Sequence, residues 1–354
     1  MAEPPRGRRH RLLRLIGAVV GIGLAALAVN VLLANKDELV GAFDTLSDPS
    51  GGWLAIAIGA ELGSFVLYAL AERVLLRSSN APVGLTALTG ISIAVQALGN
   101  CLPGGQTVAT LLGFRELQRR RVDEGLALWM IVVVAALFPA TLAILAVVGV
   151  QVAGGEGPAS GTRLAAYALL GVLALLAVVG AVLWRRGVLD RAWRRVLRAG
   201  ARSLGRRRQD GSTDQWRLGH VSPGPWGWAA VTALLAGAWL ADCACLAAAF
   251  AAVGAPVPWR GLLLAYCAGQ LAALLPITPG GLGLVEGSLT LALVAYGGGQ
   301  EQTLAAVLLY RLVSFWGVTA AGVGAYAAVR ATAPRRRVEK HVNERSPIAP
   351  EPVG

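Results

Sequence analysis

Apolar stretches of about 20 residues recur along the chain, which is long enough for a helix to cross a bilayer. The alternation of apolar and polar positions that marks a membrane β-barrel strand is absent from the sequence. The pattern therefore predicts an all-helical, polytopic integral membrane protein with about eight hydrophobic elements. The expected elements are 12–33, 53–76, 85–114, 125–150, 164–184, 227–253, 261–299 and 303–329.

Two of these apolar elements are interrupted by proline and glycine. Such residues break backbone hydrogen bonding and are not expected in an ordinary membrane helix. The two breaks share the sequence Pro-Gly-Gly and lie at corresponding places in the two halves of the chain. This arrangement indicates a transporter-like binding site built from broken helices. The residues involved are Pro103, Gly104, Gly105 and Gln106 in the first half and Pro279, Gly280, Gly281, Gly283 and Glu286 in the second.

Positively charged residues gather in segments that we expect on the cytoplasmic side of the membrane. Both termini belong to this set, and the polar, proline-containing C-terminal tail is expected to be disordered. The location expected for the protein is a bacterial plasma membrane. The predicted division is a basic N-terminus 1–11, a first membrane half 12–150, an external loop 151–162, a second half 163–330 with a cytoplasmic Arg-rich loop 185–226, and the tail 331–354.

The same charge pattern places both ends of element 85–114 on the cytoplasmic side and both ends of element 261–299 outside. Each interrupted element is therefore predicted to be a re-entrant hairpin, and the two halves are predicted to be inverted repeats. The alternative is that segments 103–114 and 282–296 cross the membrane fully. The length of 282–296 leaves that alternative open.

Arg311 and Glu286 are ionisable residues in apolar surroundings near the second break. An unpaired guanidinium inside the membrane would cost at least about 2.5–3.5 kcal/mol, so Arg311 needs a partner. Glu286 is the candidate by its position in the sequence, and a lipid phosphate is the other. A purely structural Glu286–Arg311 ion pair is an open alternative.

Glu61 and Asp242 lie in the apolar elements that precede the two breaks. Their matching places in the two halves predict a pair of acids that face a common cavity. The alternative is that each is capped by a neighbouring hydroxyl group or backbone carbonyl. Near the first break, the polar side chains expected to line the site are Asn100, Gln106, Thr107 and Arg115.

The composition supports a membrane protein, since 55% of the residues are hydrophobic and 15% are charged. The net charge of +12 lies mainly in loops and tails, which suits membrane topology and attraction to anionic headgroups better than nucleic-acid binding. Walker A, HExxH and GxSxG motifs are absent, and the four cysteines and three histidines form no metal-ligand pattern. We expect no enzymatic activity, no cofactor and no metal.

The C-terminal stretch resembles the flippase-like transmembrane domain family that accompanies lysylphosphatidylglycerol synthases, an uncharacterised conserved bacterial membrane protein family. The matching motifs are Pro279-Gly280-Gly281, Gly283, Glu286-Gly287, Tyr310-Arg311 and Ser314-Phe315-Trp316. The resemblance implies translocation of a lipid or glycolipid between leaflets. Because the soluble aminoacyl-transfer domain of full-length synthases is missing from this sequence, the chain is not expected to make lysyl-lipid itself.

The sequence thus predicts a flippase-like protein that binds and translocates an anionic or amphiphilic lipid. The alternatives are a secondary transporter of a small solute and a non-transporting membrane scaffold for a lipid-modifying enzyme. Membrane lipids and a lipid-synthesising enzyme are the expected partners. The candidate substrate-binding residues are Glu61, Pro103, Gly104, Gly105, Gln106, Arg115, Asp242, Pro279, Gly280, Gly281, Gly283, Glu286, Tyr310, Arg311 and Ser314.

Overall fold

The computed structural model describes residues 49–78, 83–101, 105–154, 223–273 and 281–332. The described residues form helices joined by turns and contain no strand, which confirms the predicted all-helical class. The predicted elements 12–33 and 164–184 lie outside the described residues, as do Pro103, Gly104, Pro279 and Gly280. The helices are α3 (Gly51–Leu75), η1 (Leu76–Ser78), α4 (Leu85–Cys101), α5 (Gly105–Arg119), α6 (Glu124–Ala153), α10 (Pro225–Ala252), α11 (Trp259–Ala273), α12 (Leu284–Ala295), α13 (Gln300–Arg311), η4 (Leu312–Gly317) and α14 (Val318–Ala331).

Four helical stretches in the described chain are long and apolar enough to cross a membrane. They are α3, α6, α10 and the continuous stretch Gln300–Ala331, with 25, 30, 28 and 32 residues. A helix of about 20 residues spans the hydrocarbon core, so all four meet the length requirement. The chain is therefore a multi-pass membrane protein.

The helix starts follow local rules. Asp123 precedes α6, and its Oδ1 accepts hydrogen bonds from the amides of Gly125 at 2.7 Å and Leu126 at 3.4 Å. Pro225 occupies the first position of α10, where its missing N–H costs nothing. Pro139 lies inside α6, and the preceding carbonyl, of Phe138, accepts a hydrogen bond from the indole of Trp239 at 2.9 Å.

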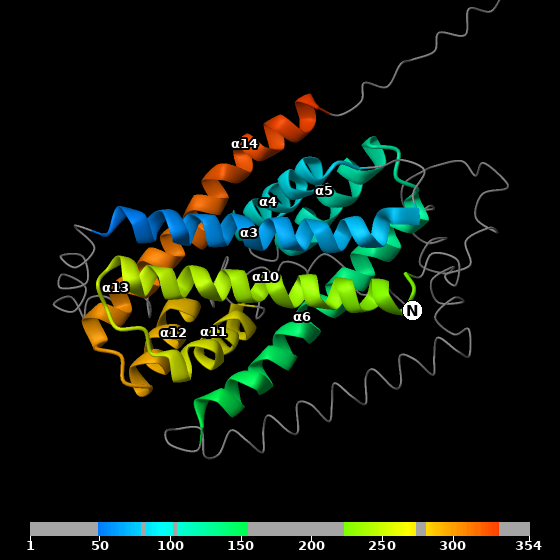
Figure 1. Cartoon of the computed structure of the whole chain (residues 1–354). Coiled ribbons are helices and arrows are strands. Elements are labelled where there is room, and N and C mark those ends of the chain that lie inside the picture. Colours follow the sequence, from blue (N-terminus) through cyan, green and yellow to red (C-terminus); the bar gives the residue numbers. More distant parts are fainter. Residues whose placement is uncertain (1–48, 79–82, 102–104, 155–222, 274–280, 333–354) are drawn as a thin grey trace, which may run out of the picture.

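The described helices repeat one order in both halves of the chain. A long helix is followed by two short helices and a second long helix, as α3, α4, α5 and α6 and again as α10, α11, α12 and α13 to α14. The leading helices α3 and α10 lie side by side and run in opposite directions (Figure 1). At one end, the amide of Ser50 donates to the carbonyl of Ala252 at 2.8 Å. An inverted repeat requires this antiparallel relation.

The short helices connect the two halves. In the first half α4 packs on α14, and in the second half α11 packs on α6, so each hairpin rests on the closing helix of the other half. Both contacts use a glycine for close approach. A Cβ at Gly322 of α14 would overlap Ala97 of α4, and one at Gly149 of α6 would lie 3.0 Å from the backbone of Leu264 in α11. This exchange of packing surfaces holds the halves together around a shared interior.

Candidate functional site

A cavity of about 520 Å³ lies between the two halves. Its lining comes from α3, α4, α5 and α6 of the first half and from α10, α11, α13 and η4 of the second. Residues close to both hairpin tips take part: Asn100 and Gln106 flank the first break, and Gln270 and Ala273 precede the second. The wall from α6 is apolar, whereas most polar groups project from the other helices.

Asp242 of α10 is the centre of a hydrogen-bond network on this cavity. Its Oδ2 accepts from the hydroxyl of Tyr266 at 2.7 Å and from the amide of Gln270 at 3.0 Å. Its Oδ1 accepts from the hydroxyl of Tyr310 at 2.9 Å. Both tyrosines are fully buried, so these donors have a fixed geometry and replace the water that the carboxylate has lost.

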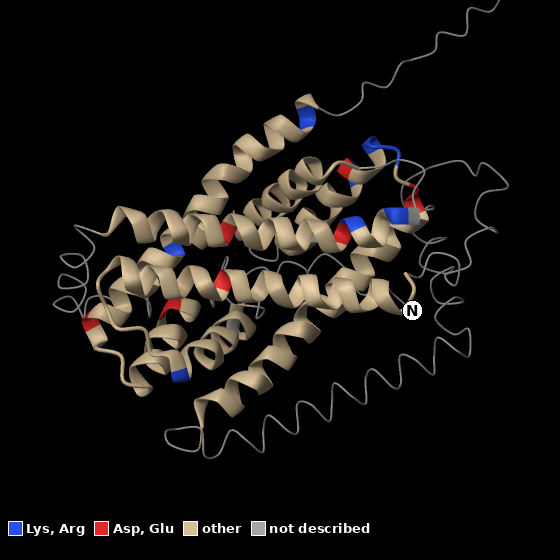
Figure 2. Cartoon of the chain, viewed as in Figure 1, with Lys and Arg blue, Asp and Glu red and all other residues tan. Residues whose placement is uncertain are grey.

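Glu61 of α3 lies next to Asp242. Figure 2 shows acidic positions in the middle of both α3 and α10, the two antiparallel neighbours. Both side chains line the cavity, and the helices that carry them pack against each other. The structure therefore brings together the two acids that the sequence placed in matching elements. The alternative expectation also holds for Asp242, because two tyrosine hydroxyls cap it.

Arg311 and Glu286 form the ion pair expected from the sequence, with 2.6 Å between Nε and Oε1. Glu286 also accepts a hydrogen bond at 2.7 Å from the amide of Gly283 through Oε2 and thereby caps the start of α12. The guanidinium lies 4.4 Å from the centre of the Phe315 ring. Arg311 lines the cavity, whereas its ion-pair partner Glu286 lies outside the cavity lining.

The turn before α12 depends on glycine. Gly281 and Gly283 have φ of 70° and 80°, a conformation that other residues rarely adopt. A side chain at Gly281 would also meet Val285. The amide of Gly283 is already used by Glu286, so it is not available to a headgroup. The glycines of this motif thus shape the loop that positions Glu286 against Arg311.

A π-helical segment, η4, follows Arg311 directly. Segments of this kind are rare and occur frequently at functional sites. Tyr310, Arg311 and Ser314 all line the cavity from this region. In contrast, Trp316 is exposed on the outside of the helix. The family motif around these residues therefore has one side in the cavity and one side on the protein surface.

The first break contributes neutral polar groups. Gln106, in the first turn of α5, lines the cavity, and Gly105 begins that helix in a buried position. Asn100 accepts from Gln96 at 3.2 Å and donates to Thr319 of α14 at 3.3 Å. Arg115 is exposed and does not line the cavity, so the structure separates it from the other candidates.

Glu72 and Gln270 are among the cavity residues that sequence reasoning missed. Glu72 lines the cavity and accepts a hydrogen bond from Ser92 at 3.3 Å. It lies about three helical turns after Glu61, on the same face of α3, and that spacing was the available signal. Gln270, which donates a hydrogen bond to Asp242, was overlooked because it lies in an apolar stretch of the sequence.

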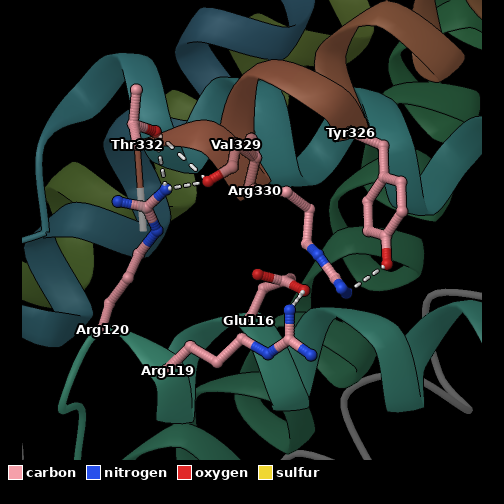
Figure 3. A network of polar contacts seen from close by, with 7 residues as sticks. All are labelled: Glu116, Arg119, Arg120, Tyr326, Val329, Arg330 and Thr332. Carbon is pink, nitrogen blue, oxygen red and sulfur yellow. Dashed lines mark hydrogen bonds and ion pairs between the residues drawn. The ribbon is translucent and has the colours of Figure 1, made fainter. Parts of the chain in front are cut away.

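A second polar network, away from the cavity, joins the end of α5 to the end of α14 (Figure 3). Arg120 donates to the carbonyl of Val329 at 2.9 Å and to Thr332 at 3.2 Å. Glu116 and Arg119 form an ion pair at 3.1 Å beside it. An arginine at the last carbonyls of a helix stabilises that end, so this network has a structural role.

The fold and the cavity define a class: a polytopic helical membrane protein with a polar, charged cavity enclosed between two halves of matching helix order. The chain belongs to the family described as the lysylphosphatidylglycerol synthase TM region, which matches residues 15–322. This match confirms the family suggested by the motifs around the second break. It extends the likeness from those motifs to most of the chain.

A relative is a UPF0104 membrane protein from Methanothermobacter thermautotrophicus, strain Delta H. It is 38% identical over 87 residues, and the aligned stretch covers 25% of this chain and 25% of the relative. The likeness therefore covers about a quarter of the length of that curated relative.

Proposed function

We propose that this protein binds an anionic or amphiphilic phospholipid or glycolipid in the central cavity and translocates it between leaflets. The observation that carries the proposal is the cavity itself, with charged groups enclosed between membrane-spanning helices. Ionisable residues inside a membrane are costly and mark substrate pathways. Membership of a family named after a lipid synthase supports a lipid as the cargo.

Arg311 is the group proposed to hold the lipid phosphate. It is the one Lys or Arg on the cavity lining within the described residues. Guanidinium groups bind phosphate and carboxylate with the same fork geometry, so a phosphate can take the place of Glu286 on Arg311. Glu286 then serves as the counter-charge that returns when the cavity empties. The apolar wall from α6 suits the part of the lipid next to the headgroup.

The two hairpins are proposed to be re-entrant, in a bacterial plasma membrane with both termini cytoplasmic. Helices α4, α5, α11 and α12 have 12 to 17 residues, which is shorter than the about 20 needed for a crossing. We propose no catalytic step in this chain, and a lipid-synthesising enzyme as the partner that supplies the cargo.

The test is mass spectrometry of lipids that copurify with the gently purified protein. The wild type is compared with Arg311→Ala and with Arg330→Ala, a control on the same continuous helix whose side chain lies outside the cavity. We expect a specific lipid with the wild type and the control that is lost with Arg311→Ala. Equal amounts of bulk membrane lipids in all three samples would contradict the proposal.

A secondary transporter of a small solute is the second candidate. The dense network around Asp242 favours it, because several donors and an acceptor converge on one point of the cavity. Uptake of a soluble compound by vesicles that contain the protein, without any copurifying lipid, would favour this candidate over the lipid flippase. A scaffold without transport would show neither result.

A further inference from the structure

We propose that Glu61 and Asp242 together bind one exchangeable proton at the contact between α3 and α10, and that this proton is coupled to occupancy of the cavity. The coupling rests on the lipid-translocating function proposed above. The proton site itself rests only on the geometry of the two carboxyl groups.

The position of the pair isolates it from bulk water. Both acids lie near the middle of a membrane-spanning helix, where α3 and α10 pack in opposite directions. Glu61 is 6% exposed, and both side chains face the cavity. Two ionised carboxylates that line one cavity, from helices that pack against each other, would repel each other, so a proton on one of the two is favoured.

The surrounding donors show which acid carries the proton. Asp242 accepts from Tyr266, Gln270 and Tyr310, which stabilises it as the charged member. Glu61 Oε2 is buried and has no hydrogen-bond partner among the described residues. It lacks the donors that a charged carboxylate needs, so Glu61 is the protonated member and Asp242 the charged one.

Among the described residues, Arg311 is the one basic side chain on the cavity lining, and the other titratable groups near the pair are acids, thiols and tyrosines. On α3 the acid is Glu72, bonded to Ser92 of α4. On α10 the buried thiols of Cys243 and Cys245 follow Asp242 closely in the sequence. From α11 and α13 come the two tyrosines, and Arg311 lines the same cavity while paired with Glu286 of α12. The residues that α4, α5 and α6 contribute to the lining are uncharged.

This charge balance gives the coupling a direction. An anionic headgroup on Arg311 adds negative charge to the cavity and makes the proton on the pair more favourable. By linkage, the protonated pair then favours the headgroup to the same extent. Loss of the proton on the other side of the membrane weakens headgroup binding and promotes release. The proton and the anionic group therefore travel in the same direction.

Infrared difference spectroscopy of the full chain in nanodiscs tests the proton site. Spectra are recorded across a pH titration for the wild type, Glu61→Gln, Asp242→Asn and the control Glu301→Gln, whose residue is exposed at the start of α13. We expect a protonated-carboxyl band that disappears at high pH. It should be lost in Glu61→Gln, shifted in Asp242→Asn and unchanged in the control.

Two spectroscopic results would overturn the site. One is a band that persists in full in Glu61→Gln while Asp242→Asn leaves it unshifted. The other is a wild-type band that changes with Na⁺ concentration at constant pH, which would make the pair a metal-cation site. If Glu61→Gln does not fold, Asp242→Asn alone decides, because a pair that shares a proton must respond to either change.

Vesicles of phosphatidylglycerol with a fluorescent phosphatidylglycerol test the coupling. We expect the wild type to move the probe faster when an imposed pH gradient runs in the direction of movement, and Glu61→Gln to lose that dependence. A wild-type rate that ignores the gradient overturns the coupling. A proton band without any lipid movement would refute the lipid function and keep the proton site. Lipid movement without the proton band would refute the proton site and keep the lipid function.

Discussion

Arg311 and Glu286 combine structure and chemistry in one contact. The ion pair holds a guanidinium at the cavity wall, and the same carboxylate caps α12 through Gly283. Both side chains are largely shielded from solvent, at 11% and 17% exposure, so little water is available to replace a lost partner. A substitution that removes one charge therefore leaves the other uncompensated.

This asymmetry predicts a double-mutant result. Arg311→Met should lower the free energy of unfolding by about 3 kcal/mol, because Glu286 loses its partner in a dry site. Adding Glu286→Gln should restore part of that loss, because the remaining charge is removed while an oxygen is kept for Gly283. Thermal unfolding of the purified variants checks this. Losses that simply add would show that the two residues act independently.

Tyr310 allows a separate test of the Asp242 network. Tyr310→Phe removes one donor to a partly buried carboxylate and should cost about 1.5–3 kcal/mol. Tyr326→Phe is the matched control, since Tyr326 accepts only from exposed Arg330. Its loss should be close to zero in the same unfolding experiment. An equal shift in both variants would mean that the Asp242 network does not stabilise the fold.

At the scale of the elements, the contact between α4 and α14 depends on the absence of a side chain at Gly322. Gly322→Leu should destabilise the protein by about 1–3 kcal/mol through overpacking against Ala97. Gly324→Leu is the control, because a Cβ there meets nothing within 4 Å. Only the first variant should lower the unfolding temperature. If Gly324→Leu lowers it equally, the close helix contact is not the cause.

For the whole molecule, the inverted arrangement predicts that the two ends of each hairpin lie on the same side of the membrane, and that the two hairpins open to opposite sides. Single cysteines replacing Gly84 and Arg121 flank the first hairpin, and those replacing Pro256 and Gly299 flank the second; all four positions are exposed. In a chain without its native cysteines, a membrane-impermeant thiol reagent should label the first two from one side and the last two from the other. Labelling of Gly84→Cys and Arg121→Cys from opposite sides would mean a full crossing.

Much of the helical layout could be predicted from local sequence. The runs 53–76, 125–150 and 227–253 agree closely with α3, α6 and α10, because hydrophobic length is a property of a short segment. The ion pair between Glu286 and Arg311 was also predictable, since an arginine inside the membrane needs a partner close by. The presence of Glu72 on the cavity lining, and the absence of Arg115 from it, depend on which helix face meets the cavity.

The sequence by itself determined the class of protein, the long membrane helices, the two glycine-rich breaks and the family. These depend on composition, periodicity and motifs within single segments. Only the tertiary structure decided that Glu61, Asp242 and Glu72 line one cavity, and that Tyr266, Gln270 and Tyr310 supply the donors to Asp242. Those contacts join helices distant in sequence, and they follow from how α3 and α10 pack, which no local pattern encodes.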